Sequence, residues 1–275
     1  MLSISGQQLT VLPQNWTKTI HFVRHGEAMS NVHGEKNRAQ YKSPEWFDAD
    51  LSEKGWAQAE ALGKHVAAKG IKPQLVVVSP LTRALQTASA AFCSQPVAMN
   101  GAAPMVMMAK QAEKAGYKVA RMELLANGAP PFIACELCRE YVGLNPCDRR
   151  NSTSYQKKAF PGVDWSFITL EEDTLFPKDS HESMEHLGAR VVEFMEWLMQ
   201  RPEHEVAVVS HSKFLSVLFT KCAEEAGSSV SEPAKADLSR WFENCELRTV
   251  VFAAPTAPIP CTAKSTHFPG GHSVV

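Results

Sequence analysis

The sequence predicts an α/β protein, a three-layer α/β/α sandwich with a mostly parallel central sheet. Short runs of apolar residues recur along the chain, and such runs are typical of strands that helices cover on both faces. Between the runs lie segments with apolar residues at helical spacing. Strands that alternate with helices place those helices on both sides of one sheet. At 44% hydrophobic and 21% charged, the 275 residues hold ample apolar material for such a core.

Four apolar runs predict strands of this sheet. Three of them end on polar or cationic residues: Arg24-His25 after the first, Ser79 after the second and Ser210-His211 after the third. The fourth lies near the C-terminus. The runs cover residues 20–23, 75–78, 206–209 and 250–252.

Three helices are predicted between and after these strands. Ser52 is a favourable N-cap for a helix through His65, in which apolar residues recur at helical spacing. A second periodic segment begins near Leu187 and runs to about Arg201. A third helix, around residues 215–219, follows the strand that ends at Ser210-His211.

The segment 92–179 interrupts the alternation of strands and helices. It contains seven prolines and little sustained periodicity. We therefore expect a long insertion that packs over the C-terminal edge of the sheet. No linker rich in proline, glycine or serine separates two halves, so we expect a single domain over residues 1–275.

Charge and composition exclude several classes of function. The 28 basic and 29 acidic residues are spread along the chain, so neither a nucleic-acid partner nor a membrane is expected. The N-terminus lacks the pattern of a signal peptide, and no apolar stretch is long enough to cross a bilayer. The odd number of cysteines, seven, indicates reduced thiols and a cytoplasmic protein. The lone CxxC at 135–138 has no second ligand pair, so we expect no metal and no cofactor.

The polar residues at the strand ends predict a pocket for an anion. Ligands of an open parallel sheet bind beyond the carboxyl ends of its strands, which would gather Arg24, His25, Arg83 and His211 at one edge. Arginine forks match the oxygens of a phosphoryl group, and imidazole is a competent nucleophile near neutral pH. A carboxylic acid is then needed to protonate the leaving alkoxide. The expected partner is a small phosphorylated substrate.

Ordered sequence blocks around these residues resemble the histidine phosphatase superfamily, in its phosphoglycerate-mutase-like branch. A single Arg-His-Gly is weak evidence, but these blocks follow one another in the family's order between residues 19 and 220. A further block, 137–140 followed by 146–150, is similar to a fungal and plant group of phosphoglycerate-mutase-like phosphatases. The main blocks are Arg24-His25-Gly26-Glu27 with Asn31, residues 51–55, residues 79–87, Glu182-Ser183 with Arg190, and Ser210-His211-Ser212.

The resemblance implies a role for each matching residue. His25 would be phosphorylated, and His211 would be the second histidine, which stabilises charge. Arg24 and Arg83 would hold the phosphoryl oxygens, with help from Asn31.

The resemblance also places a proton donor in the loop after the second block. Glu140 is the first candidate, although its spacing to the following glycine is one residue shorter than in the mutases. Glu136 is the alternative. Arg149 and Arg150 would either contact the substrate or form structural ion pairs.

Two departures from the family pattern bear on the function. Ser212 stands where the family has glycine after the second histidine, and Lys213 adds a cation at the pocket mouth. The Thr-Gly-Trp segment of true mutases is missing after Asn31, which makes water the expected phosphoryl acceptor.

The sequence therefore predicts a metal-independent phosphatase that hydrolyses a small phosphate monoester through a phosphohistidine. The alternatives are a phosphoglycerate-type mutase and a catalytically weak, phosphate-binding regulatory module. Trp46 is expected to pack in the core or to line the pocket mouth.

Overall fold

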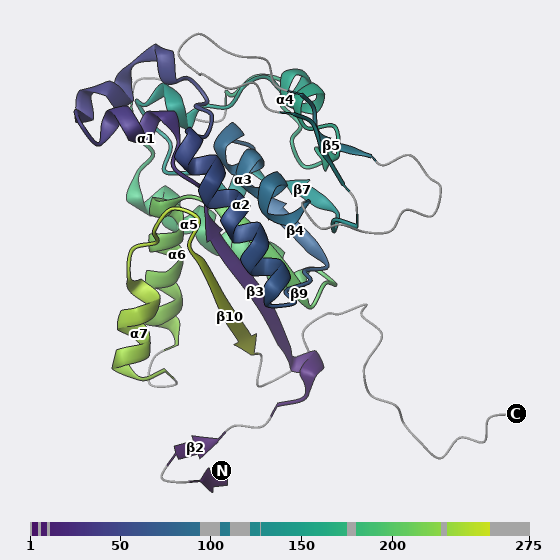
Figure 1. The fold of residues 1–275 in the computed structure, drawn as a ribbon. Coiled ribbons are helices and arrows are strands. Elements are labelled where there is room, and N and C mark those ends of the chain that lie inside the picture. Colours follow the sequence, from purple (N-terminus) through teal and green to yellow (C-terminus); the bar gives the residue numbers. More distant parts are fainter. Residues whose placement is uncertain are drawn as a thin grey trace, which may run out of the picture.

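A six-stranded sheet forms the centre of the molecule in the computed structural model, with helices on both of its faces (Figure 1). The structure describes residues 2–4, 7–9, 12–93, 105–110, 122–126, 128–174, 180–226 and 230–253. The strands of the sheet are β3 (Thr17–Arg24), β4 (Leu75–Val78), β7 (Phe132–Ala134), β8 (Val163–Asp164), β9 (Glu205–Ser210) and β10 (Leu247–Ala253). The α-helices are α1 (Met29–Gly34), α2 (Glu53–Ala68), α3 (Thr82–Phe92), α4 (Thr153–Ala159), α5 (Met184–Gln200), α6 (Ser212–Glu225) and α7 (Glu232–Ser239).

The strand order is β10-β3-β9-β4-β7-β8, and the pairing is parallel from β3 to β8. Only β10 runs antiparallel, at the edge next to β3. The predicted α/β class and mostly parallel sheet are confirmed. Because β3, β9 and β4 are parallel neighbours, Arg24, Ser210 and Val78 lie at the same end of the sheet. The segments that follow these three strands therefore meet at one edge.

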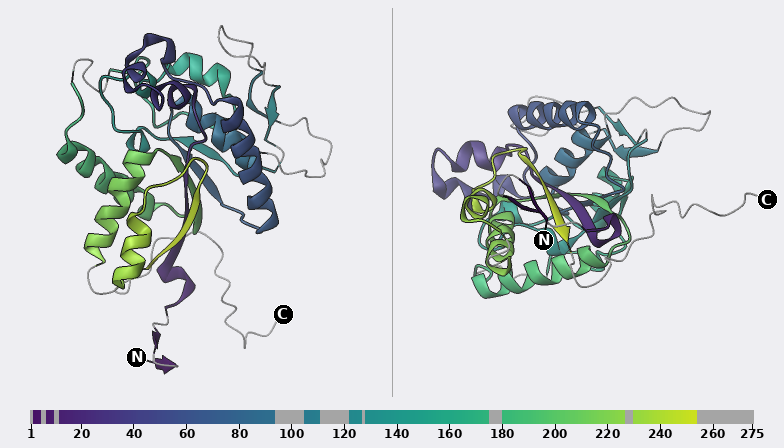
Figure 2. Two further views of the ribbon diagram at one scale, coloured as in Figure 1. Left: turned by 60° about the vertical axis from the view of Figure 1, so that its left-hand side comes forward. Right: turned by 90° about the horizontal axis from the view of Figure 1, so that it is seen from below.

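Two apolar layers hold helices to the sheet because alternate strand residues point to opposite faces. The blue α2 and α3 cover one face, and the green α5 and α6 cover the other (Figure 2). On β3, Val23 joins the layer under α2 and α3, whereas Ile20 and Phe22 join the layer under α5 and α6. The central strands are thus buried on both sides, which explains their continuous apolar runs.

The predicted helices are present, with small shifts at their ends. Ser52 is the N-cap of α2, and its hydroxyl accepts a hydrogen bond from the Gly55 N–H at 3.0 Å. Ser183 caps α5 in the same way through the His186 N–H at 3.0 Å. The third predicted helix is α6, which begins directly after His211.

The segment 92–179 contributes more to the sheet than its sequence predicts. Strands β7 and β8 extend the central sheet beyond β4, although each has only two or three residues. Runs this short carry no readable periodicity, and Pro130 and Pro131 directly precede β7. The remaining elements described here are β5 (Val106–Met108), β6 (Leu124–Leu125), and the 3-10 helices η4 (Glu136–Cys138) and η5 (Pro146–Asp148). Residues 94–104, 111–121, 127 and 175–179 of the predicted insertion lie outside the described residues.

Short elements near the N-terminus complete the fold. They are β1 (Leu2–Ile4), β2 (Gln7–Leu9), η1 (Gln14–Trp16), η2 (Arg38–Lys42) and η3 (Pro44–Trp46). Strands β1 and β2 pair with each other and not with the central sheet. Within the described ranges, no helix has the length and apolar character needed to span a membrane.

Candidate active site

A cavity of about 350 Å³ opens at the carboxyl ends of β3 and β9. It collects side chains from segments far apart in the sequence, as expected for an open parallel sheet. Its walls contain seven of the predicted site residues, namely Arg24, His25, Asn31, Arg83, Glu140, Ser212 and Lys213. The other lining residues are Ser30, Glu35, Tyr41, Tyr141, Asn145, Cys147, Asp148 and Trp241.

His25 follows the last residue of β3 and is only 3% exposed. Its backbone N–H donates to the Ser210 carbonyl of β9 at 3.0 Å, which fixes the main chain at the end of the sheet. The ring Nδ1 donates to the Gly26 carbonyl at 2.6 Å, so Nε2 carries the lone pair. Burial, with the nearby Arg83 and Arg24 charges, holds the pKa of His25 well below its ordinary value. His25 is therefore a neutral imidazole whose unprotonated nitrogen is Nε2.

Arg83 lies on α3 and binds both His25 and the η5 segment. Its Nε–H donates to His25 Nε2 at 3.2 Å, and Nη2 forms an ion pair with Asp148 at 2.8 Å. The Nη1 group donates to the Cys147 carbonyl at 2.5 Å. Burial opposes the charge of Arg83, but Asp148 raises its pKa, so the guanidinium stays charged beside His25. Arg83 is thus a fixed cation at the nitrogen that would receive a phosphoryl group.

Arg24 and Asn31 line the same cavity. Arg24 ends β3, and its Nη1 donates to the Phe242 carbonyl at 2.7 Å. The buried Arg24 Nε has no hydrogen-bond partner among the described residues. Asn31 lies on α1, where its Oδ1 accepts the Ala28 N–H at 2.9 Å at the start of that helix. Arg24 therefore retains an N–H group for an anion in the cavity.

Glu140 lies opposite the histidine, in the loop after η4. Its Oε1 accepts the N–H groups of Tyr141 at 2.9 Å and of Phe214 at 3.2 Å. Its Oε2 lies 3.4 Å from both the Lys213 N–H and the Ser212 hydroxyl, which donate to it. The carboxyl group thus sits on the N-terminus of α6, where free N–H groups attract an anion.

The protonation of Glu140 is governed by competing effects. Burial and the nearby Asp148 charge raise the pKa of Glu140, while the hydrogen bonds from Tyr141 and Lys213 and the charge of Arg83 oppose this. The net shift is upward. A carboxyl group with a raised pKa in a cavity beside a histidine can hold a proton for a leaving group.

His211 lies behind the cavity wall, fully buried at the junction of β9 and α6. The centroid of its ring is 4.9 Å from that of His25. The Nε2 atom is 2.7 Å from the Ser79 hydroxyl, and Nδ1 has no hydrogen-bond partner in the described part of the chain. Burial and Arg83 lower the pKa of His211 well below its ordinary value, so the ring is neutral. It can offer a single N–H to a bound oxygen and carries no positive charge.

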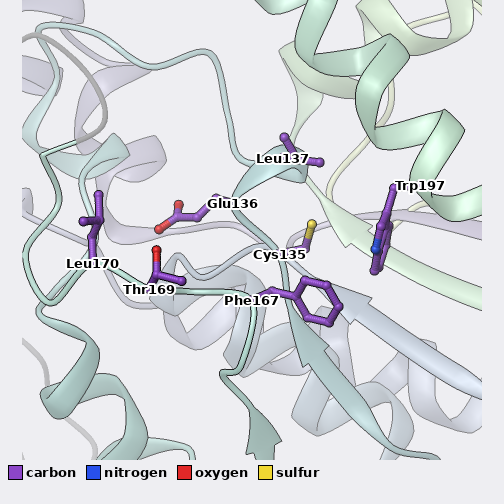
Figure 3. A pocket seen from close by; sticks show the side chains of 7 residues that line it. All are labelled: Cys135, Glu136, Leu137, Phe167, Thr169, Leu170 and Trp197. Carbon is purple, nitrogen blue, oxygen red and sulfur yellow. The ribbon is translucent and has the colours of Figure 1, made fainter.

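Glu136, the alternative proton donor, lies elsewhere. Figure 3 shows it among the side chains that line a second cavity of about 270 Å³, with Cys135, Phe167 and Trp197. Its carboxylate forms ion pairs with Arg139 at 3.0 Å and with Arg150 at 2.7 Å. Two buried arginines thus hold Glu136 as a structural anion away from His25.

The two arginines of the 146–150 block also lie outside the walls of the cavity at His25. Arg150 is buried in the ion pair with Glu136 and donates to the carbonyls of Leu170 and Glu171. Arg149 is half-buried. Of this block, Cys147 and Asp148 are the residues that line the cavity.

Several cavity residues carry no sequence signal. Tyr41, Tyr141 and Trp241 add aromatic side chains to the walls, and Trp241 comes from the loop before β10. Trp46, which was expected in the core or at the mouth of the pocket, is buried with Ala49 and Cys147.

Across the described ranges, no three His, Cys, Asp or Glu side chains cluster as metal ligands would.

Comparison with known families identifies this arrangement. The model of the histidine phosphatase superfamily, branch 1, matches residues 20–100 and 152–252 of the chain. The chain belongs to the histidine phosphatase superfamily. The gap between the two matched stretches includes β7, η4 and η5, so the family model does not cover the loop that carries Glu140.

Relatives of similar length refine this assignment to the superfamily. A phosphoglycerate mutase-like protein of Arabidopsis thaliana is 38% identical over 269 residues, 97% of this chain and 96% of the relative. Phosphoglycerate mutase-like protein 1 of the same plant is 37% identical, over 97% of this chain and 92% of its own. The plant phosphoglycerate-mutase-like resemblance predicted from the motifs is confirmed.

A solved structure supports the fold alone. The ecdysone phosphate phosphatase of Bombix mori, determined with tungstate, aligns over 91% of this chain and 96% of its own. The TM-score is 0.50 and the sequence identity is 14%. The three-layer architecture of the superfamily is therefore present in this chain.

Proposed function

We propose that this histidine phosphatase-superfamily chain is a metal-independent phosphatase of small phosphate monoesters, with a phosphohistidine intermediate at His25. One observation carries the proposal. His25 is a neutral imidazole with its lone pair on Nε2, and Nε2 lies 3.2 Å from the charged Arg83 Nε at a cavity that also contains a carboxyl group with a raised pKa.

In the first step, His25 Nε2 attacks phosphorus and the bond to the ester oxygen breaks. Arg24 and Arg83 bind the phosphoryl oxygens, whose charge they stabilise as the group is transferred. The free Nε–H of Arg24 and one N–H of the neutral His211 ring are further donors for these oxygens. Fixed donors of this kind need no reorganisation during the reaction, which is why they lower the barrier.

Glu140 completes this step by giving its proton to the departing alkoxide. In the second step, water attacks phosphorus, the Glu140 carboxylate accepts a proton from it, and the bond between phosphorus and Nε2 breaks. Inorganic phosphate leaves and both groups return to their starting protonation states. A raised pKa serves the donor role because the carboxyl group must hold its proton until the ester bond breaks.

The names of similar proteins support both hydrolysis and transfer as activities to test. The Bombix mori structure is named as a phosphatase, and the plant relatives are named as phosphoglycerate mutase-like. The missing Thr-Gly-Trp segment favours water as the acceptor in this chain.

The test is hydrolysis of p-nitrophenyl phosphate in excess chelator, comparing wild type with His25→Ala. We expect a loss of at least about 1000-fold, because removal of the nucleophile leaves only binding. His65→Ala is the matched control, since His65 is an exposed histidine on α2, and it should retain full activity. Full activity in His25→Ala would rule out the proposal.

A second measurement examines the intermediate and the acceptor. Rapid quenching under alkaline conditions should trap labelled phosphate on wild type but not on His25→Ala. Incubation with 3-phosphoglycerate and a bisphosphate primer should release inorganic phosphate faster than it forms 2-phosphoglycerate. Transfer that exceeds hydrolysis would instead assign a mutase, and phosphate binding with no turnover would assign a regulatory module.

A further inference from the structure

Arg190 binds the loop that carries Glu140 through both terminal nitrogens of its guanidinium group. It lies on α5, is 5% exposed and is absent from the cavity walls. Nη1 donates to the carbonyls of Leu137 at 2.8 Å and Arg139 at 2.9 Å. Nη2 donates to the carbonyl of Glu140 at 3.0 Å. The backbone of the proposed acid is therefore held by an arginine that does not itself reach the cavity.

The remaining N–H groups of Arg190 bind Glu182. Nε and Nη2 donate to the two carboxylate oxygens at 2.9 and 2.7 Å. All five guanidinium N–H groups thus have acceptors, which is the full capacity of an arginine. A lysine offers three donors from one point and cannot reproduce this planar fork.

Glu182 holds the loop on the other side of Glu140. Its backbone N–H donates to the Val142 carbonyl at 2.8 Å, and its carboxylate accepts the Val142 N–H at 3.3 Å. The Glu182 side chain is completely buried. The main chain is therefore held by α5 before and at Glu140, and by the segment directly preceding α5 after it.

The same guanidinium group also contacts α6. Arg190 lies over the ring of Phe214, 5.4 Å from its centroid, and the Phe214 N–H donates to Glu140 Oε1 at 3.2 Å. Arg190 thus touches the two elements that determine where the carboxyl group points: its own loop and the helix end on which it rests.

We propose that Arg190, paired with Glu182, is a positioning residue that keeps Glu140 in line with the leaving group. This inference rests on the proposed function of Glu140 as proton donor. It predicts that a change at Arg190 affects proton donation and spares phosphoryl transfer itself. Other anchors retain the loop in such a variant, because Arg139 pairs with Asp173 at 2.7 Å and Ser210 bonds the Cys138 carbonyl at 2.7 Å.

The experiment compares kcat/KM for an alkyl phosphate, such as glycerol 2-phosphate, with kcat/KM for p-nitrophenyl phosphate. These two constants, called the alkyl rate and the aryl rate, cover the steps up to departure of the leaving group and exclude hydrolysis of the phosphohistidine, in which Glu140 also acts. The nitrophenolate ion leaves without a proton, so its release does not need Glu140. For Arg190→Lys we expect the alkyl rate to fall about 10- to 100-fold, in the lower range of general-acid effects, and the aryl rate to change less than about threefold. Arg201→Lys is the control, since Arg201 lies at the other end of α5 in an ion pair with Glu203, and should leave both rates unchanged.

A double variant separates positioning from general damage. If Arg190 acts through Glu140, adding Arg190→Lys to Glu140→Gln will not lower the alkyl rate further. Losses that multiply, or an equal fall on both substrates, would overturn the inference. Glu182→Gln should show the same selective loss of the alkyl rate, and it decides the question if Arg190→Lys does not fold.

Failure of the proposed function has a different signature. A folded wild type that hydrolyses neither substrate overturns the proposed function, and the positioning role with it. An active wild type whose ratio of alkyl to aryl rates is unchanged in Arg190→Lys and Glu182→Gln overturns the positioning role alone.

Discussion

Gly55 lies where the first turn of α2 touches the backbone that follows His25. A methyl group at this position would lie 2.0 Å from the Glu27 carbonyl oxygen and 2.9 Å from its carbon. Ordinary contacts begin at 3.4 Å, so Gly55→Ala requires the two backbones to separate by about 1.4 Å. Neither is a flexible side chain that can turn away. Glu27 is two residues from His25, so the proposed nucleophile is expected to move with it.

The geometry sets the expected size of the effect. Misplacement of a reacting group by about 1 Å can reduce the rate about 100-fold, and we expect a loss of that order in kcat for p-nitrophenyl phosphate. Overpacking should also lower the free energy of unfolding by about 1–3 kcal/mol. For a protein of this size each kcal/mol corresponds to a fall of about 3 °C in Tm.

Gly70→Ala provides a control with the same chemical change. Gly70 has a φ of 65°, and a methyl group there would meet nothing within 4 Å. The positive φ alone should cost about 1 kcal/mol. Gly70 follows the C-terminal end of α2, and about 20 Å of helix, at 1.5 Å per residue, separates that end from Gly55. We expect this variant to lose stability but retain full kcat. Wild-type kcat in Gly55→Ala, or an equal loss of kcat in Gly70→Ala, would show that this contact does not position His25.

Further predictions concern pH, metals and stability. The kcat/KM for an alkyl phosphate should decrease as pH rises through the pKa of Glu140, which burial and Asp148 raise, because the deprotonated acid has no proton to give. A kcat/KM profile that Glu140→Gln leaves unaltered would contradict this. Asp148→Asn removes a negative charge near Glu140, so the decrease should move to lower pH by on the order of one pH unit, and a shift to higher pH would be inconsistent with the electrostatics. Excess chelator should leave kcat unchanged, whereas inhibition that added Mg²⁺ or Zn²⁺ reverses would require a metal-dependent mechanism. Asp48 is buried and accepts hydrogen bonds from Thr82 and Asn151. Asp48→Ala should therefore lower the free energy of unfolding, measured by urea denaturation, by about 3 kcal/mol. An unfolding free energy equal to that of wild type would argue against this network as a source of stability.

The central strands and main helices are readable from the sequence because their signals are local. A continuous apolar run such as Leu75–Val78 reports burial on both faces, and Ser52 reports the start of α2 through its own hydroxyl. The same local reading fails for β7 and β8. β7 pairs with the edge of β4 and β8 pairs with the edge of β7, and these edges exist only in the assembled sheet.

Sequence alone determined which residues gather at the carboxyl ends of the strands, because parallel strands bring their ends together whatever separates them along the chain. Arg24, His25 and Arg83 follow from this rule and from their motifs. The choice between Glu136 and Glu140 does not, because the two lie four residues apart in the same loop. The tertiary structure is what separates their surroundings: buried arginines pair with Glu136 outside the walls of the cavity at His25, whereas the carboxyl group of Glu140 lines that cavity and accepts N–H groups at the N-terminus of α6. The proposal of Glu140 as the proton donor rests on this difference. Where a side chain in a loop points depends on the charges and free N–H groups that distant segments bring to it.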